Sequence, residues 1–132
     1  MIGDRLKSMG KKGFKDLVIW KQAKDPAVMI YQISEGGALG RDFGLRDQIR
    51  RSAVSIASNI AEGDERDTDR ESVRFFYIAK GSLAELRTQV EVAYEIDYLK
   101  KQVYERIEEK CLTLGKMIGS LIKARQNVKG QK

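Results

Sequence analysis

Seven basic side chains in the middle of the sequence are the first candidates for a binding function. They are Arg46, Arg50, Arg51, Arg66, Arg70, Arg74 and Lys80. Arginine and lysine contact phosphate oxygens, and several such contacts together favour nucleic-acid binding by releasing counterions. The sequence contains no RNA-recognition motif, zinc finger or stacking aromatic platform, so any recognition is expected to depend on charge or shape. We therefore predict that these residues contact RNA or DNA.

A second set of polar residues has two interpretations. It consists of Asn59, Glu62, Ser82 and Glu85, which either form hydrogen bonds between helices or bind a ligand. We favour a hydrogen-bonded network that sets the register of the helices, because each unpaired buried polar group costs about 1 to 3 kcal/mol. Replacement of Asn59 by alanine is then expected to lower the thermal stability.

Enzymatic activity is not expected. The chain has no histidine, which excludes Ser-His and Cys-His catalysis, zinc sites that need imidazole, and the Glu-x-x-His di-iron motif. The pair Glu62 and Glu65, or the group Glu105, Glu108 and Glu109, could bind Mg²⁺ as in a metal-dependent nucleotide hydrolase. Solvated helix faces are the favoured interpretation of these carboxylates. We predict no catalytic residue, no metal and no cofactor.

The composition is that of one soluble domain. The 132 residues are 42% hydrophobic and 33% charged, and no apolar run approaches the roughly 20 residues that a membrane-spanning helix needs. Cys111 is the only cysteine, so a reducing cytoplasm is the expected compartment and no membrane association is predicted. The formal net charge of +6 is concentrated at the two ends. We predict a flexible basic leader at 1–13, a folded domain at 14–125 and a basic tail at 126–132.

Hydrophobic periodicity predicts the elements that position these side chains. Four amphipathic helices are expected at about 16–34, from 43 or 45 to 61, at 68–96 and at 101–124, with a glycine-rich loop at 35–44. Asp16, Asp42 and Thr68 are candidate N-caps, and Thr68 with Glu71 has the spacing of a capping box. Pro26 is expected to kink the first helix, and Gly63 to end the second with a positive φ. Four helices with short connections predict an all-α, antiparallel up-down-up-down four-helix bundle.

Some apolar residues lie outside the predicted core faces, which suggests an oligomer. Val54 and Ala61 lie on the second side of one helix, Tyr77 on the second side of the next, and Leu112 outside the core face of the last. Gly81 in mid-helix also suggests that another backbone approaches closely there. We therefore expect these surfaces to be buried against another subunit.

Several motifs resemble a known family. They are Phe14-x-x-Leu17-x-x-Trp20-x-x-Ala23, Tyr31, Leu45-x-x-Gln48-x-x-Arg51, Ser55-Ile56, Asn59-Ile60-Ala61-Glu62-Gly63, Arg66, Glu71, Phe75, Ile78-Ala79, Gly81-Ser82-Leu83 and Glu85-Leu86. The pattern, over residues 14–99, is similar to the bacterial four-helix bundles encoded in intervening sequences of 23S ribosomal RNA genes, also called S23 ribosomal proteins. Members commonly have proline where this chain has Ala57, so the second helix is expected to be straighter here.

The resemblance implies a ring-like homo-oligomer, a pentamer. The chain also resembles the accessory variability proteins of diversity-generating retroelements, which implies binding to nucleic acid and to a reverse transcriptase. A non-enzymatic accessory or scaffold protein with a repeated basic surface is therefore expected. The alternative is a scaffold that binds only other proteins.

Overall fold

The structure is a computed structural model that describes the backbone of residues 13–130 and the side chains of residues 13–126. Its elements are a 3-10 helix η1 (Gly13–Asp16) and the α-helices α2 (Val18–Ile33), α3 (Gly37–Arg41), α4 (Phe43–Asp64), α5 (Asp69–Glu95) and α6 (Lys101–Gly130). The described residues contain no strand. The all-α prediction is confirmed, with four long helices and one short α-helix. The predicted leader lies, except for Gly13, outside the described residues.

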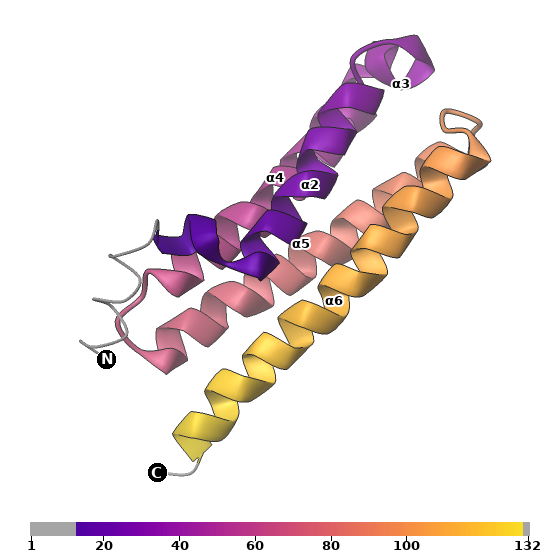
Figure 1. Ribbon diagram of the computed structural model, residues 1–132. Helices are drawn as coiled ribbons and strands as arrows, with labels where there is room; N and C mark the ends of the chain where they lie inside the picture. Colours follow the sequence, from indigo (N-terminus) through magenta and orange to yellow (C-terminus); the bar gives the residue numbers. More distant parts are fainter. Residues whose placement is uncertain (1–12, 131–132) are drawn as a thin grey trace.

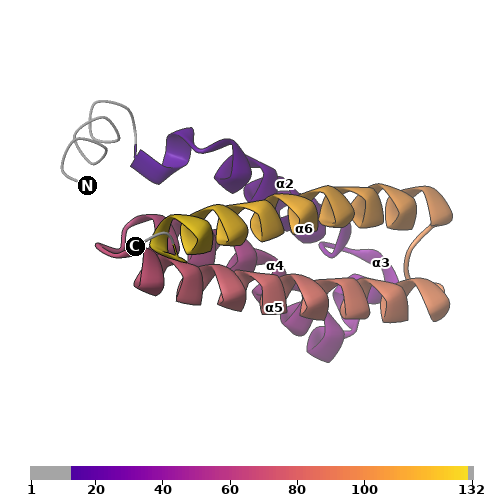
Figure 2. The same cartoon turned by 90° about the horizontal axis from the view of Figure 1, so that it is seen from below.

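The long helices pack side by side. Helix α4 contacts α2 on one side and α5 on the other, and α6 contacts both α5 and α2. Helix α3 lies at the end of the molecule where α2 is joined to α4 (Figure 1). Helices α5 and α6 run alongside each other over most of their length (Figure 2). Each long helix thus has one face toward the others and one face toward the surface.

Two of the three predicted caps are present. The Asp42 carboxylate accepts a hydrogen bond from Leu45 N at 3.1 Å, and the Thr68 hydroxyl accepts one from Glu71 N at 3.2 Å. These bonds satisfy N–H groups that lack partners in the first turn of a helix. The prediction for Asp16 is wrong, because α2 begins after Leu17 without a side-chain cap. Pro26 lies within an unbroken α2.

The glycine-rich segment folds more than the sequence suggests. Residues 37–41 form α3 instead of a loop, and Gly37, at φ 69°, supplies the left-handed conformation at its start. Leu39 is buried with 1% of its surface exposed. A short helix is not stable by itself in water. Burial of the Leu39 side chain against the long helices therefore stabilises α3. Helix α6 likewise continues beyond its expected end at 124, to Gly130.

The core follows the apolar stripes of the long helices. Its largest fully buried side chains are Phe76, Ile30, Leu39, Ile49, Ile56, Ile60, Leu86, Ile107, Leu114 and Ile118. Tyr31, one of the family-motif residues, lies outside this core, and its side chain is 47% exposed. The expected positive φ at Gly63 is also absent, since Gly63 lies inside α4 and is buried.

Candidate functional site

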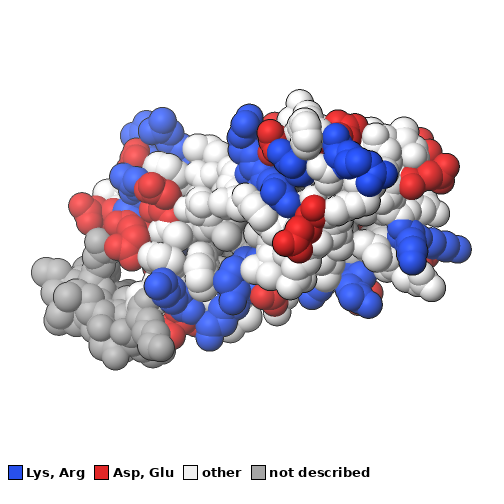
Figure 3. Space-filling view, turned by 90° about the horizontal axis from the view of Figure 1, so that it is seen from above, with Lys and Arg blue, Asp and Glu red and all other residues white. Residues whose placement is uncertain are grey.

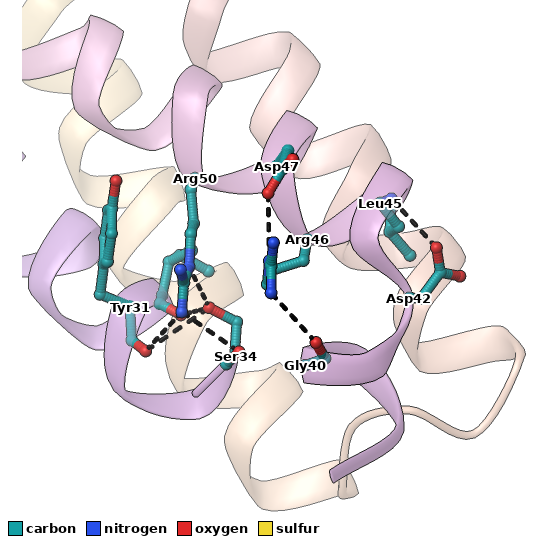
Figure 4. Close-up of polar contacts among 9 residues, drawn as sticks. Tyr31, Ser34, Gly40, Asp42, Leu45, Arg46, Asp47 and Arg50 are labelled. Atoms are coloured by element: carbon teal, nitrogen blue, oxygen red, sulfur yellow. Dashed lines mark hydrogen bonds and ion pairs between the residues drawn. The ribbon is translucent and has the colours of Figure 1, made fainter. Parts of the chain in front are cut away.

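The Arg50 guanidinium binds other groups of the protein instead of being free at the surface. Its Nε donates to the Ser34 hydroxyl at 2.8 Å, and its Nη2 donates to the Ser34 carbonyl at 3.2 Å. The guanidinium also lies over the Tyr31 ring, with Cζ 4.4 Å from the ring centroid. Arg50 of α4 thereby binds the carbonyl oxygens of Tyr31 and Ser34 at the end of α2 (Figure 4).

Arg46 has a similar role one turn earlier. Its Nη1 donates to the Gly40 carbonyl at 3.4 Å and its Nε pairs with Asp47 at 3.0 Å. Its guanidinium stacks on the Phe43 ring at 4.7 Å. Both arginines hold the corner formed by α2, α3 and α4 (Figure 4). The N–H groups of both guanidinium groups already bind other atoms of the protein. Arg46 and Arg50 are therefore less available to phosphate than the sequence suggests.

The remaining predicted basic residues lie nearer the surface. Arg66 pairs with Glu62 and stacks on Phe75, and Arg74 lies 3.9 Å from Glu71. Lys80 lies 6.0 Å from the centroid of the Tyr77 ring, a contact that leaves its charge free.

Arg51 and Arg70 are exposed. No ion pair is recorded for either side chain within the described part of the chain. The seven predicted residues are therefore not equivalent. The most available charges among them are those of Arg51, Arg70, Arg74 and Lys80.

The charges do not form one continuous basic surface on the face seen from above. Figure 3 shows lysine and arginine side chains interspersed with acidic ones, with uncharged surface between them. The electric fields of neighbouring surface charges of opposite sign partly cancel each other. This face alone therefore does not present the long basic track expected of a nucleic-acid groove.

The predicted polar network is brought together only in part. The Ser82 hydroxyl of α5 lies 2.8 Å from the Ser55 hydroxyl of α4. Asn59 donates from Nδ2 to the carbonyl and hydroxyl oxygens of Ser55, at 2.8 and 3.0 Å. Asn59 and Ser82 are thus linked through Ser55. Glu62 instead pairs with Arg66 at the surface, and Glu85 lies exposed outside the linked group.

Further serines along α4 and α5 complete a row of contacts that sequence reasoning missed. Ser52 donates to Gln89 Oε1 at 2.6 Å, and Ser72 donates to the Gly63 carbonyl at 2.7 Å. Each bond joins two helices, and each serine is buried. The sequence did contain a sign of these contacts, because both serines occupy positions within the apolar stripes of their helices. A polar side chain buried in such a stripe requires a hydrogen-bond partner.

An apolar groove lies between α2 and α4, on the outer side of the core. Its volume is about 560 Å³. It is lined by Phe14, Trp20, Lys24, Ala27, Val28, Tyr31, Gln32, Val54, Ala57, Ser58 and Ala61. Val54 and Ala61, the two residues expected on the second side of their helix, both contribute to it. Val28, Tyr31 and Val54 are 41 to 48% exposed, so apolar surface is left in contact with water here.

Comparison with known proteins identifies the family. Residues 15–120 match the model of the 23S rRNA-intervening sequence protein family. The chain belongs to this family. Its fold is similar to the crystal structure of a protein with unknown function from the S23 ribosomal protein family of Bacteroides thetaiotaomicron. The two share 25% sequence identity with a TM-score of 0.74, and the match covers 80% of this chain and 99% of that one. A comparison with curated proteins gives no match.

This member of the 23S rRNA-intervening sequence family has one further polar cluster, where α5 approaches α6. The Tyr104 hydroxyl donates to Glu91, and the two rings of Tyr94 and Tyr104 stack at 4.1 Å. That hydrogen bond raises the pKa of Tyr104 to about 12 and lowers the pKa of Glu91. A hydrogen bond with Glu91 raises the pKa of Glu95. The cluster joins two helices by a phenol that stays protonated at neutral pH.

The described residues of this family member show neither a cluster of metal ligands nor a membrane-spanning helix. Within the part of the chain that the structure describes, no three potential ligands among His, Cys, Asp and Glu are grouped to hold a metal ion. None of the described helices has the length and apolar character required of a membrane span. The features that remain for a functional assignment are the apolar groove and the available basic side chains.

Proposed function

We propose that the protein is a non-enzymatic accessory scaffold. In this proposal the four long helices form an antiparallel up-down-up-down bundle. Copies of the bundle assemble into a homopentameric ring, and the ring binds nucleic acid through basic side chains repeated around it. The proposal includes a cytoplasmic location, where a retroelement's reverse transcriptase would be a further partner.

The apolar groove between α2 and α4 is the observation that carries the assembly. A groove lined by Trp20, Tyr31 and Val54 exposes apolar surface whose removal from water stabilises a complex by about 25 cal/mol per Å². Large exposed apolar patches on soluble proteins commonly mark interaction sites. A second copy of the same chain is the occupant we propose.

Nucleic-acid binding is supported by two exposed basic residues. Arg51 and Arg70 are exposed, and no ion pair is recorded for them among the described residues. One copy offers few such charges. A ring repeats them at fixed spacing, so weak phosphate contacts combine into a stronger one.

Light scattering after size-exclusion chromatography tests the assembly. The wild-type protein is expected to elute as a pentamer, and Val54→Glu is expected to elute as a monomer with unchanged helical content. Val92→Glu is the matched control, because Val92 is similarly exposed (45%, against 41% for Val54) and lies outside the groove. A monomeric wild-type protein at micromolar concentration would contradict the proposal.

Binding to structured RNA and duplex DNA across a salt series tests the second part. Affinity should fall steeply as salt rises, because each phosphate contact releases a counterion. No binding at low salt, together with salt-tolerant capture of one specific protein, would support the protein-only scaffold instead.

A further inference from the structure

The hairpin formed by α5 and α6 separates its charges along its length. Residues 69–84 of α5 contain three basic side chains and two acidic ones. Residues 110–126 of α6 contain four basic side chains and no acidic one, and one of the four, Arg125, lies 3.7 Å from Asp69. The other half is acidic: residues 85–95 contain three acids and one base, and residues 101–109 three acids and two bases. Such separation within one hairpin creates a directed field at its surface.

The two basic segments are neighbours in space. Gln126 of α6 donates a hydrogen bond to the Tyr77 hydroxyl of α5 at 3.3 Å. Farther along, Arg87 pairs with Glu108 at 2.9 Å, which places the acidic segments of the two helices beside each other as well. The hairpin therefore has one basic half and one acidic half, and the two helices lie side by side over most of their length (Figures 1 and 2).

Within the basic half, Arg70 and Arg74 lie on one outer stripe of α5, and Lys116 and Lys123 lie on one outer stripe of α6. Helical spacing aligns Arg70, Arg74, Tyr77, Gly81 and Ala84 on α5, and Leu112, Lys116, Gly119, Lys123 and Gln126 on α6. Residues at these spacings lie on one face of a helix. All of them are exposed except Gly119, which is half-buried. Lys80 lies beside this stripe, with its ammonium group near the Tyr77 ring.

Gly81 and Gly119 form an open surface among these charges, which we call the glycine floor. No atom outside the local helix backbone lies within 4 Å of the position that a Cβ would occupy on Gly81 or on Gly119. A bulky ligand can therefore approach both helix backbones closely while the basic side chains reach around it.

We propose that this basic half of the α5–α6 hairpin binds the phosphate backbone of a nucleic-acid duplex. Arg70, Arg74, Lys80, Lys116 and Lys123 contact phosphates, and the glycine floor admits the sugar-phosphate chain. The acidic half repels the duplex and thereby sets where on the hairpin it lies. This site rests on the proposed nucleic-acid function. It relocates that function away from Arg46 and Arg50, which are bound to carbonyl oxygens.

A duplex fits this surface better than a single strand. Single-strand sites combine a basic track with several aromatic side chains on which successive bases stack. The face contains one aromatic residue, Tyr77, which is 49% exposed and already bound to Gln126. Recognition by phosphate contacts alone predicts little sequence preference.

The test compares two triple variants that remove equal charge. The first variant removes three of the five proposed phosphate contacts, by Arg74→Ala, Lys116→Ala and Lys123→Ala. Lys21→Ala, Lys101→Ala and Arg106→Ala together form the control, since these residues are also exposed but lie elsewhere. Binding to a 20-base-pair RNA duplex, a DNA duplex of equal length and the separated strands is measured from low to physiological salt.

The face variant is expected to lose about tenfold or more in duplex affinity at low salt, and its log-affinity slope against log salt should fall by about 3. The control should keep the wild-type slope. Equal losses in both variants, a greater loss in the control, or tighter binding of single strands would overturn the assignment while leaving nucleic-acid binding intact. Wild-type protein that binds no duplex at low salt would overturn the proposed function itself.

A second, uncharged variant tests the floor. Gly119→Gln adds a long side chain to the glycine surface without changing the charge, and it is expected to weaken duplex binding with unchanged helical content. Unchanged duplex affinity in this variant would contradict close approach of the sugar-phosphate chain.

Discussion

Gly63 of α4 and Phe76 of α5 are packed so closely that no side chain larger than hydrogen fits between them. A Cβ placed on Gly63 would lie 2.5 Å from Cε1 of Phe76 and 2.8 Å from its Cδ1. Phe76 is itself 1% exposed and lies in the core, so its ring has little room to move. Glycine is therefore required at position 63 by the approach of the two helices and not by a left-handed backbone.

Gly63→Ala is expected to lower the free energy of unfolding by about 1 to 3 kcal/mol, because overpacking in a dense core forces side chains and backbone to shift. Urea denaturation followed by circular dichroism measures the change. Stability equal to the wild type would show that the Phe76 ring can rotate away.

Gly81→Ala is expected to act in the opposite direction. Nothing lies within 4 Å of its Cβ position, so alanine adds no clash and removes up to about 1 kcal/mol of unfavourable helix propensity. The close approach that its sequence position suggested is absent within the described chain. Thermal melting at the same protein concentration should give a higher midpoint than the wild type, and a lower one would reveal an unrecorded contact.

Arg50→Lys is expected to lower the free energy of unfolding by about 1 to 2 kcal/mol, because lysine cannot reproduce the forked hydrogen bonds to Ser34 or the stacking on Tyr31. Arg51→Lys is the control, and a change within about 0.5 kcal/mol is expected for an exposed residue. Chemical denaturation of both variants provides the measurement. If the two changes are equal, the contacts of Arg50 do not stabilise the corner.

The Ser55 and Ser82 hydroxyls are expected to be energetically coupled. Ser82→Ala should cost about 1 kcal/mol, because it leaves the half-buried Ser55 hydroxyl without its partner on the other helix. A double-mutant cycle with Ser55→Ala should give a coupling energy of about 0.5 kcal/mol or more. Asn59→Ala is expected to lower the thermal midpoint as well, since Asn59 binds the same serine. Strict additivity across the cycle would remove the network as a determinant of register.

Cys111 is expected to make stability depend on pH in the alkaline range. Burial raises the pKa of its thiol to about 11, because the thiolate is poorly solvated in the core. The folded-state pKa is thus above the unfolded value of about 8.5, so the stabilisation is fully present below pH 8.5 and is lost as the pH rises toward 11.

Denaturation at pH 8 and pH 10 measures this effect. Wild-type protein should lose more stability between these values than Cys111→Ala, which has no thiol to ionise. An identical decrease in both proteins would show that other groups, such as the tyrosines, determine the alkaline behaviour.

The four long helices and two of their three expected caps could be predicted from the sequence alone. Asp42 and Thr68 cap helices through bonds to residues three positions away, and the apolar periods that define the core recur every three or four residues. Such interactions join residues that are close together in the sequence, so they can be predicted without the tertiary structure. The family motifs likewise identified the family that the model match confirmed.

The partners of individual residues were decided only by the tertiary structure. Arg50 reaches Ser34, sixteen positions earlier, and Gly63 is constrained by Phe76 in the next helix. Both facts depend on how closely and at what register the helices pack, which the pattern of one helix does not contain. The same reason separates Gly63 from Gly81: both are glycines on helices, but only one faces a neighbouring ring.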